Sequence, residues 1–312
     1  MVFYSVVIPT YNRQPILAQC LQALENQNFA LSYEVIVVDD GSADGTVEWL
    51  RSHPLSHVRL YCQTHQGPSA ARNLGIAQAQ GTLIVFIDSD LVVTGQFLQA
   101  HELARQQAQQ RLGNDRFFTY GRVINTCNFE HPTAASYKLT DFSAAYFATG
   151  NVAIARHWLE TVGGFDPDFQ GYGWEDLELG VRLKQRGLKQ VKVPTAVGYH
   201  WHPPFQLSQL PALIDQEKQR SRMGLLFYQK HPTLHVKLMV QMTPLHSLLW
   251  GVLTWGGHLN EDSLRPLLAW LIRQGRSQLA LEISRVFLNW HYLQAFKATN
   301  RHQTPSHPWR NT

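Results

Sequence analysis

The sequence predicts an α/β fold: a parallel, doubly wound sheet covered by helices on both faces. Short apolar runs of strand length alternate with helical periodicity throughout residues 5–90, which is the pattern of successive strand–helix–strand units. The run Leu83–Ile87 is apolar without interruption, as in strands buried on both faces of a sheet. With 44% hydrophobic and 16% charged residues, the 312-residue chain has enough apolar material for a large core.

The elements of residues 5–90 can be assigned in order. Strands are expected at residues 5–8, 35–38, 57–61 and 83–87, and helices near residues 12–25, at 46–51 and from 68 onward. Pro15 and Pro68 are typical of the first turn of a helix. The first helix has one apolar face, made by Ile16, Leu17, Cys20, Leu21 and Leu24. In the helix that starts at Pro68, we expect the inward side chains to be Ala70, Ala71, Leu74 and Ala77.

The elements beyond the central strand are more varied. The first is a glutamine-rich helix at 95–112, to which we assign no chemistry. It is followed by strands at 117–124 and 149–155, a helix at 174–186, and a pair of strands at 191–199 around Pro194. The apolar stripe of the 174–186 helix is expected at Leu177, Val181 and Leu188. Because the composition shifts to helix formers beyond Pro204, we expect an α/β domain at 1–204, a helical extension at 205–298 and a disordered tail at 299–312.

Charge is unevenly divided along the chain. Residues 1–204 carry a net charge of −3 and residues 205–312 a net charge of +7, which favours an anionic partner for the C-terminal part, either a membrane surface or a phosphorylated acceptor. No helix-turn-helix, RNP or zinc-finger pattern supports a nucleic acid partner. For residues 239–259, two interpretations are open: a helical subdomain packed on the edge of the sheet, or peripheral membrane contact through tryptophans and basic side chains.

The cysteines and apolar runs predict a cytoplasmic protein. Cys20, Cys62 and Cys127 form no C-x-x-C pair, so we expect reduced, buried thiols rather than a disulfide or zinc framework. A strand-like run already begins at Ser5, and no apolar run reaches the ~18–20 residues that span a bilayer. We therefore expect no signal peptide, and membrane contact only at the cytoplasmic face.

Two carboxylates follow the central strand, at Asp88 and Asp90. Such groups at the end of a buried strand are costly unless a cation meets them, and the carboxyl ends of central strands are where open α/β sheets bind ligands. Hard oxygen ligands two residues apart suit Mg²⁺ or Mn²⁺ holding a diphosphate. The alternative is a solvated Asp-Ser-Asp turn.

Other polar groups are expected at the same edge of the sheet. Asp39 heads the run Asp-Asp-Gly-Ser after the second strand; it either forms an Asx-type turn or accepts a hydrogen bond from a base or ribose. Arg72, one turn into its helix, is either a surface residue or a clamp for phosphate oxygens. No G-x-G-x-x-G follows the first strand, which disfavours an NAD-type dinucleotide site.

A glycine-rich stretch delivers Glu175 and Asp176 to the start of a helix. Acids there complement the helix dipole, and an ionised carboxylate in an aromatic-lined pocket is a candidate base for a sugar hydroxyl. Tyr172 and Trp174 either stack on a sugar or belong to the core. His200 and His202 end the last strand; since neighbouring strand positions alternate between faces, we expect only one of them to reach the site. An imidazole ligand would shift the metal preference towards Mn²⁺.

Taken together, these stretches resemble the family 2 glycosyltransferases of the GT-A fold, whose sheet is mixed and doubly wound. The matching pieces are SVVIPTYNR (5–13), VIVVDDGSADGT (35–46), GPSAARNLGI (67–76), FIDSD (86–90), TGNVAIAR (149–156) and GGFDPDFQGYGWEDLELGVRL (163–183). The GWEDLEL segment is similar to the acceptor-side motif of the chondroitin-polymerase and galactosyltransferase branches, although it reads GYGWED where the latter has GGED.

The resemblance implies roles for particular residues. Contacts to the donor nucleotide would come from Pro9, Thr10, Tyr11, Arg13, Asp39, Arg72, Asp88 and Ser89. The metal would be held by Asp90 and Asp88, with His200 or His202 completing its shell. The acceptor subsite would contain Gly150, Asn151, Trp174 and Glu175, and Asp176 would be the catalytic base.

The resemblance also implies a reaction. It is an inverting transfer of a sugar from a nucleotide-diphosphate donor, normally a UDP-sugar, to a hydroxyl of a glycan or a lipid-linked sugar, assisted by Mn²⁺ or Mg²⁺. Two alternatives remain. A sugar-phosphate nucleotidyltransferase would need a glycine-rich basic loop after the first strand, which PTYNRQP lacks, and a non-catalytic nucleotide-sugar binder or scaffold would need no catalytic base.

Overall fold

The computed structural model describes residues 3–303, which divide into two compact units. The first contains residues 3–170 and 175–203, and the second contains residues 171–174 and 204–303. The division lies one residue before the boundary expected from composition. The short segment 171–174, expected in the α/β domain, belongs to the second unit. Within the described residues, no helix combines the length and apolar character needed to cross a membrane.

The first unit is built on one mixed sheet of eight strands. Its strands are β1 (Tyr4–Thr10), β2 (Tyr33–Asp39), β3 (Val58–Cys62), β4 (Leu83–Ile87), β5 (Leu91–Val93), β6 (Phe117–Thr126), β7 (Asn151–Ala155) and β8 (Lys189–Trp201). Their order across the sheet is β3-β2-β1-β4-β7-β6-β8-β5. The first four run parallel, as predicted, whereas β7 is antiparallel to both β4 and β6. The predicted mixed, doubly wound α/β fold is confirmed.

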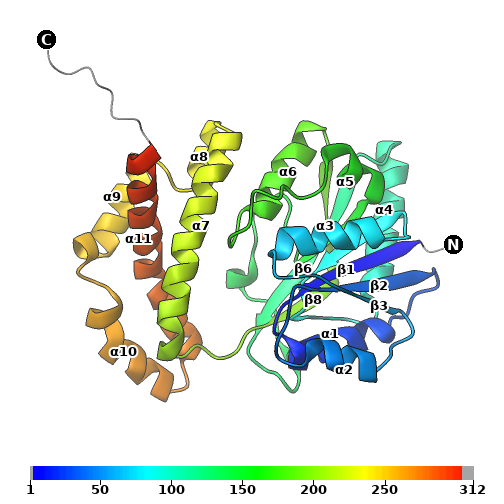
Figure 1. Ribbon diagram of the computed structural model, residues 1–312, viewed down its shortest axis with the longest axis horizontal. Coiled ribbons are helices and arrows are strands. Elements are labelled where there is room, and N and C mark those ends of the chain that lie inside the picture. The colour runs from blue at the N-terminus through cyan, green and yellow to red at the C-terminus, as the bar shows by residue number, and fades with distance from the viewer. Residues whose placement is uncertain (1–2, 304–312) are drawn as a thin grey trace, which may run out of the picture. The chain divides into compact units, whose positions relative to one another are not determined.

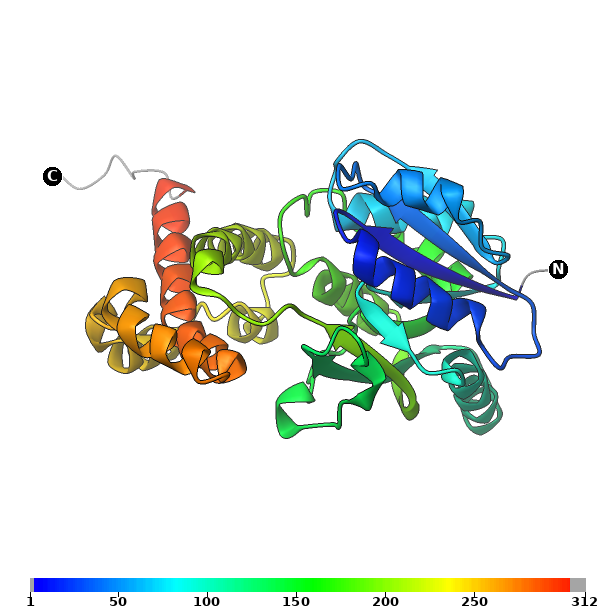
Figure 2. The same cartoon turned by 90° about the horizontal axis from the view of Figure 1, so that it is seen from below.

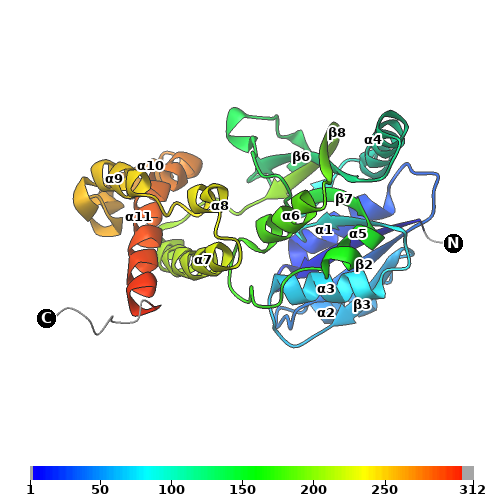
Figure 3. The ribbon, with the colours of Figure 1, turned by 90° about the horizontal axis from the view of Figure 1, so that it is seen from above.

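Helices cover both faces of this sheet. Those of the first unit are α1 (Gln14–Glu25), α2 (Thr46–Ser52), α3 (Pro68–Gln78), α4 (Phe97–Leu112), α5 (Arg156–Val162) and α6 (Glu175–Gln185). Val6 and Ile8 of β1 pack with α1 and α4, and Figure 2 shows the dark blue α1 in front of the sheet. Val7 packs with α3, α5 and α6 on the other face, which is the face nearest the viewer in Figure 3. Because both faces are covered, the strands read as continuous apolar runs.

Two predicted helix faces were only partly right, for a common reason, although Ala71 and Leu188 are buried as expected. In α3, Ala77 is exposed, whereas Arg72 and Gly75 are buried. In α6, the buried leucines are Leu179 and Leu183 rather than Leu177 and Val181. Periodicity read from large apolar residues cannot anticipate a buried arginine with carboxylate partners, or a glycine that lets a helix approach a strand closely. The cysteine expectation also needs correction, as Cys20 is buried but Cys62 and Cys127 are exposed, all three as free thiols.

Strand β8 is continuous, although a pair of strands around Pro194 was predicted. Val193 pairs with Gly121 of β6, but the next paired residue, Val197, lies opposite Arg122. Residues 194–196 therefore form a bulge, which accommodates a proline that could not donate to a regular ladder. Beyond the bulge, β8 pairs with β6 on one side and β5 on the other, so that His200 lies opposite Leu91.

The second unit is helical, as expected. Its helices are α7 (Leu210–Lys230), α8 (Leu234–Met239), α9 (Pro244–Leu253), α10 (Glu261–Arg273) and α11 (Ser277–Gln303). α7 packs beside α11 (Figure 1), and the core includes Leu210, Leu271 and Phe287. Residues 299–303, assigned to a disordered tail from the sequence, continue α11, and 304–312 lie outside the described residues.

Candidate active site

The carboxyl edge of the parallel strands gathers most of the predicted site residues. β1 ends at Thr10, paired with Asp39 at the end of β2, and the turn Asp88–Asp90 connects β4 to β5. The side chains that make direct contacts there are Arg13, Arg72, Asp88, Asp90, Glu175 and His200. Segments separated by more than one hundred residues therefore converge where the fold class predicts a ligand.

Asp39 and Thr10 each present one buried polar atom without a hydrogen-bond partner among the described residues. The Asp39 Oδ1 atom accepts hydrogen bonds from the N–H groups of Gly41 and Ser42, at 3.1 and 3.0 Å. Its Oδ2 atom and the Thr10 Oγ1 atom are buried and have no hydrogen-bond partner in the described part of the chain. Buried polar atoms without partners are costly, so both are suited to a ligand. The two interpretations of Asp39, a turn and a ligand contact, thus apply to its two different oxygens.

The adjacent loop is held by Asp40, whose role is structural. Its Oδ1 accepts from the Gln66 N–H and its Oδ2 from the Gly67 N–H, both at 2.8 Å. These bonds fix the entry to α3. Tyr11 stacks on His65 with ring centroids 4.3 Å apart, which leaves an aromatic surface beside Thr10.

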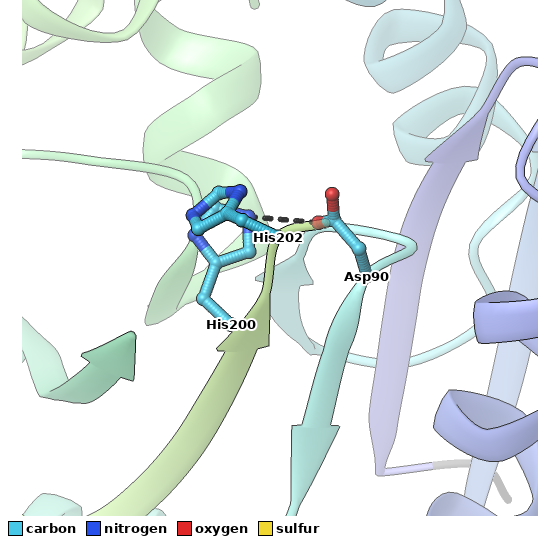
Figure 4. Close-up of side chains that lie close together, drawn as sticks. All are labelled: Asp90, His200 and His202. Atoms are coloured by element: carbon cyan, nitrogen blue, oxygen red, sulfur yellow. Dashed lines mark ion pairs between the residues drawn. The ribbon is translucent and has the colours of Figure 1, made fainter. Parts of the chain in front are cut away.

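Asp90, His200 and His202 form a candidate metal site (Figure 4). One ligand atom from each lies within 4.8 Å of the others, and the His200 Nε2 atom lies 2.8 Å from Asp90 Oδ1. His202 is positioned by Asn125, whose Oδ1 atom is 3.2 Å from its Nε2 atom. One carboxylate and two imidazoles form a donor set that suits Mn²⁺ better than Mg²⁺. The residues present therefore fit the expected ion.

The expectation that only one histidine faces the site was wrong. Residues two apart on a strand share a face, because the side-chain period of a strand is two. The rings of His200 and His202 accordingly lie 4.1 Å apart between centroids. Asp88, also predicted as a metal ligand, does not belong to this three-residue group.

The charges of the pair Asp90 and His200 support each other. Burial opposes ionisation of Asp90, but the hydrogen bond and charge of His200, with help from Arg13, keep the pKa of Asp90 below its usual value. Burial likewise opposes protonation of His200, yet Asp90 raises the pKa of His200 above its usual value. A cation is thus favoured beside Asp90, which a proton on His200 supplies when no metal does.

Arg72 is buried between two carboxylates. Only 6% of its side chain is exposed, and its guanidinium donates to Asp88 Oδ1 at 3.1 Å and to Glu175 Oε1 at 3.2 Å. The Arg72 Nε atom and the Glu175 Oε2 atom are buried and unpaired among the described side chains. A donor and an acceptor therefore remain for a ligand. Gly150 lies against Asp88, because a Cβ atom there would sit 3.2 Å from Asp88 Oδ2.

Asp176 begins α6 next to Glu175. Burial and the negative charge of Glu175 raise the pKa of Asp176 to about 7, against the opposing charge of Arg72. A carboxyl group with such a pKa can take up a proton near neutral pH. Tyr120, which the sequence analysis did not select, lies close enough for the charge of Asp176 to add to burial in raising the pKa of Tyr120.

Asn151 does not serve the acceptor subsite through its side chain. It is buried, and its Nδ2 atom donates to the carbonyl oxygens of Arg122 and Ala196, each at 3.0 Å. Its Oδ1 atom lies 2.9 Å from Nε2 of the buried His101. With every polar atom engaged, Asn151 links β6 to the bulge of β8, and the predicted contact with an acceptor is corrected to a positioning role.

His101 was missed because it lies in the glutamine-rich helix to which no chemistry was assigned. Its Nε2 atom must carry the proton, since it faces the Asn151 oxygen, and its Nδ1 atom then accepts from Thr119 at 2.8 Å. Burial lowers the pKa of His101 to about 4. A histidine on an otherwise polar helix gives no sequence signal that distinguishes it from a surface residue.

Trp174, predicted to stack on a sugar, is buried in the second unit. Its Nε1 atom donates to the Arg220 carbonyl at 2.8 Å, and its ring packs near Phe227 and Tyr292. Its backbone φ of +77° is unusual for a non-glycine residue and is stabilised by this packing. The core interpretation of Trp174 therefore holds.

Comparison with known protein families agrees with this geometry. The profile described as glycosyl transferase family 2 matches residues 5–161, half of the chain, and that described as the N-terminal domain of galactosyltransferase matches residues 130–204. The chain belongs to glycosyl transferase family 2. It is an enzyme of the glycosyltransferase class, as predicted.

Individual relatives differ in length and named activity. A chondroitin synthase of Escherichia coli is 31% identical over 238 residues, covering 64% of this chain and 35% of that protein. A validoxylamine A glucosyltransferase of Streptomyces hygroscopicus subsp. jinggangensis is 31% identical over 306 residues, covering 84% of this chain and 67% of that protein. This glycosyltransferase thus spans about a third of the chondroitin synthase that it matches.

Solved structures show the same fold. The mannosyltransferase PcManGT from Pyrobaculum calidifontis, in complex with GDP-Man and Mn²⁺, has a TM-score of 0.55 and 21% identity, covering 96% of this chain and 86% of that chain. Residues 1–349 of S. aureus TarS, in complex with UDP-GlcNAc, have a TM-score of 0.53 and 14% identity, covering 97% and 93%. At these identities the likeness shows the GT-A fold alone.

Proposed function

We propose that this glycosyltransferase is metal-dependent and inverting, and that it transfers a sugar from a UDP-sugar to a hydroxyl of a glycan or a lipid-linked sugar. The observation that carries the proposal is the set of groups along one sheet edge. They are polar atoms of Asp39 and Thr10 without partners among the described residues, the Asp90–His200–His202 cluster, and a carboxyl group of raised pKa at Asp176. A nucleotide, a diphosphate and an acceptor hydroxyl would each need one of these groups.

The nucleotide base would be recognised by the first group. Uracil has an N–H flanked by carbonyl oxygens, so the N–H would donate to Asp39 Oδ2 and a carbonyl would accept from the Thr10 hydroxyl, two atoms that have no protein partner. Tyr11, whose ring is half-exposed against His65, would stack on the base. Pro9, Arg13 and Ser89 remain proposed donor contacts.

The diphosphate would lie beside Asp90. His200, His202 and Asp90 would hold Mn²⁺, which, when bound, supplies positive charge to the departing diphosphate. Arg72 would contribute from the α3 side, since its Nε–H is unpaired. Its two carboxylate contacts hold the guanidinium in place before substrate arrives, which is the preorganisation that electrostatic catalysis requires.

Asp176 would act as the base. As the acceptor oxygen forms its bond to the anomeric carbon, the bond from that carbon to the diphosphate breaks and the acceptor proton passes to Asp176. Attack from the side opposite the leaving group inverts the configuration. Glu175, with one buried oxygen unpaired, would bind an acceptor hydroxyl, and Gly150 would let the acceptor approach Asp88.

The partners follow from this chemistry. The donor is a nucleotide-sugar, and the acceptor is a carbohydrate hydroxyl. A lipid-linked acceptor would place the reaction at a membrane surface, so peripheral contact of the basic helical unit with such a surface, on the cytoplasmic side, belongs to the same proposal.

Thermal unfolding with UDP, GDP or dTDP, each with Mn²⁺ or with EDTA, tests the donor site. A ligand at about 100 times its dissociation constant adds about 2.7 kcal/mol to the free energy of unfolding. We expect stabilisation by UDP with Mn²⁺ and little by UDP with EDTA. Asp39→Asn is the matched control, because it keeps the turn acceptor but replaces the unpaired oxygen by an N–H donor. Absence of any nucleotide response would favour a scaffold without donor binding.

A further inference from the structure

Helix α9 of the helical unit exposes its apolar side. Leu245, Leu248, Leu249, Val252 and Leu253 are each between 44% and 69% exposed. Their spacing of i, i+3, i+4, i+7 and i+8 places them on one side of the helix. A contiguous apolar stripe of this kind marks a surface that contacts something else. We call these five residues the α9 face.

The opposite side of α9 is anchored, which fixes the α9 face outward. The Trp250 Nε1 atom donates to Gln241 Oε1 at 2.7 Å. A Cβ atom at Gly251 would lie 3.7 Å from the Trp290 ring of α11, and Thr254 is fully buried. Trp250 and Gly251 thus face the protein, and the α9 face lies on the other side of the helix.

A tryptophan stands at the end of the same helix. Trp255 is 73% exposed, and it begins a turn in which Trp255, Gly256 and Gly257 all have positive φ. Gly257 packs so closely on Trp290 that a Cβ atom would lie 2.7 Å from its Nε1 atom. The turn is therefore fixed by packing, and it leaves the amphipathic indole ring of Trp255 outside, the kind of residue that sits at a bilayer interface.

The segment that contains α9 has no acidic residue. Residues 218–260 include no aspartate or glutamate, whereas they include Lys237 on α8, and acidic residues resume at Glu261 and Asp262. Lys297 of α11 lies 5.8 Å above the Trp290 ring, the ring on which α9 packs. An exposed apolar stripe in a segment that carries basic and no acidic residues is a combination that favours binding to anionic bilayers.

We propose that the α9 face, together with Trp255, docks on the surface of a bilayer that contains anionic lipids. The ten residues of α9 are too few to span a bilayer but sufficient to lie in its interface. A second copy of the chain is a less favourable occupant, because symmetric pairing would bring together two copies of segment 218–260, which carries basic but no acidic residues. The inference rests on the peripheral contact in the proposed function and gives it a defined surface.

Vesicle flotation of the full chain tests the docking. The vesicles are phosphatidylcholine alone, or phosphatidylcholine with phosphatidylglycerol at 7:3. We expect at least tenfold more protein to float with the anionic vesicles, and the double variant Leu248→Glu/Val252→Glu to lose at least tenfold of this binding. Leu103→Glu, which alters a leucine of α4 that is as exposed as Leu249, is the matched control and should float like the wild type.

Three outcomes would overturn the proposal. They are absence of flotation, equal flotation of the wild type and the double variant, and self-association in solution that the double variant abolishes, which would assign the α9 face to a second copy. Stabilisation by UDP and Mn²⁺ is measured on the same samples. If UDP and Mn²⁺ stabilise the protein but it does not float, the docking proposal is wrong and the donor site is supported. If the protein floats but UDP and Mn²⁺ do not stabilise it, the donor site is wrong and the docking surface is supported.

Discussion

The two units place polar and apolar groups in opposite ways at their most informative surfaces. In the sheet unit, apolar strands are covered on both faces, and buried polar atoms of Asp39, Thr10, Arg72 and Glu175 lack a hydrogen-bond partner within residues 3–303. In the helical unit, the side of α9 that packs inward carries Trp250 and Gly251, and the α9 face points outward. Each is a departure from the rule that apolar groups are inside and buried polar groups are paired. Each departure suits a different proposed ligand. Unpaired polar atoms in the sheet unit suit a polar, charged nucleotide-sugar, and exposed leucines in the helical unit suit an anionic bilayer.

The largest expected effect is at the proposed base. Asp176→Asn should reduce transfer by at least 10³-fold, because it removes the carboxylate proposed to take the acceptor proton. Stabilisation by UDP with Mn²⁺ should persist, as measured by thermal unfolding. Asp115→Asn, which alters a half-exposed carboxylate away from this edge, is the control. Loss of donor binding comparable to the loss of transfer would mean that Asp176 has another role.

Removing a metal ligand should have the next largest effect. His200→Asn is expected to weaken Mn²⁺ binding by about 100-fold, since it removes one of the three proposed protein ligands and the contact between His200 and Asp90. Electron paramagnetic resonance titration of Mn²⁺ measures this without substrate. His231→Asn, a histidine of the helical unit, serves as the control. Unchanged Mn²⁺ affinity in His200→Asn would remove His200 from the site.

The pH dependence of transfer sharpens the assignment of Asp176. The base must be ionised, so with a pKa of about 7 the rate should fall as the pH drops below 7, approaching tenfold per unit. The free energy of unfolding changes with pH in the opposite direction to the rate. Because the pKa of Asp176 is raised on folding, the protonated group favours the folded state, and this contribution is lost as pH rises from 3.8 towards 7. Asp176→Asn should therefore unfold at a higher temperature than the wild type at pH 8. A lower unfolding temperature there would contradict the raised pKa.

His101 predicts a smaller, structural effect. Its pKa of about 4 in the folded chain lies below the usual 6.5, so its contribution to stability is present at neutral pH and is lost as pH falls from 6.5 towards 4. His101→Leu should lower the free energy of unfolding at pH 7.5 by about 1–3 kcal/mol, because the Asn151 oxygen is left unpaired. Chemical denaturation at pH 7.5 and pH 5 measures both, and the difference between variant and wild type should shrink at pH 5.

The smallest expected effect is on α9, and it tests the comparison directly. Leu21→Ala in α1, a fully buried position, should lower the free energy of unfolding by about 2–5 kcal/mol. Leu248→Ala on the α9 face should change it by no more than about 0.5 kcal/mol. Urea denaturation of the two variants provides the measurement. A large cost at Leu248 would show that α9 is covered within the protein.

The sequence predicted the alternation of strands and helices because both signals are local. Apolar runs, proline at helix starts and carboxylates after strands located β1 to β4 and the residues at their ends. Fold and family were predicted correctly from these motifs. The mixed part of the sheet was harder to place, since residues 117–201 pair in an order that no local pattern gives.

The site errors have a different origin. Asn151 and Trp174 were placed near the acceptor by motif, but their polar atoms bond to groups distant in sequence, Ala196 and Arg220. His101 was passed over for the same reason, since its partners are 18 and 50 residues away. Which side chains a buried polar group meets is decided by tertiary packing, which periodicity does not contain. The histidine error was geometric and avoidable, as His200 and His202 share a strand face by spacing alone.

The bulge of β8 sets the phase of the metal ligands. Three extra residues, 194–196, separate the partner of Gly121 from the partner of Arg122, and three is an odd number. Strand side chains alternate between the two faces of a sheet. An odd number of extra residues therefore turns every side chain beyond the bulge to the face opposite the one it would have in an uninterrupted strand. Inserting one residue there would exchange His200 and His202 for Tyr199 and Trp201 beside Asp90. The length of this small irregularity, held by the Asn151 amide, is thus as much a determinant of metal chemistry as the histidines themselves.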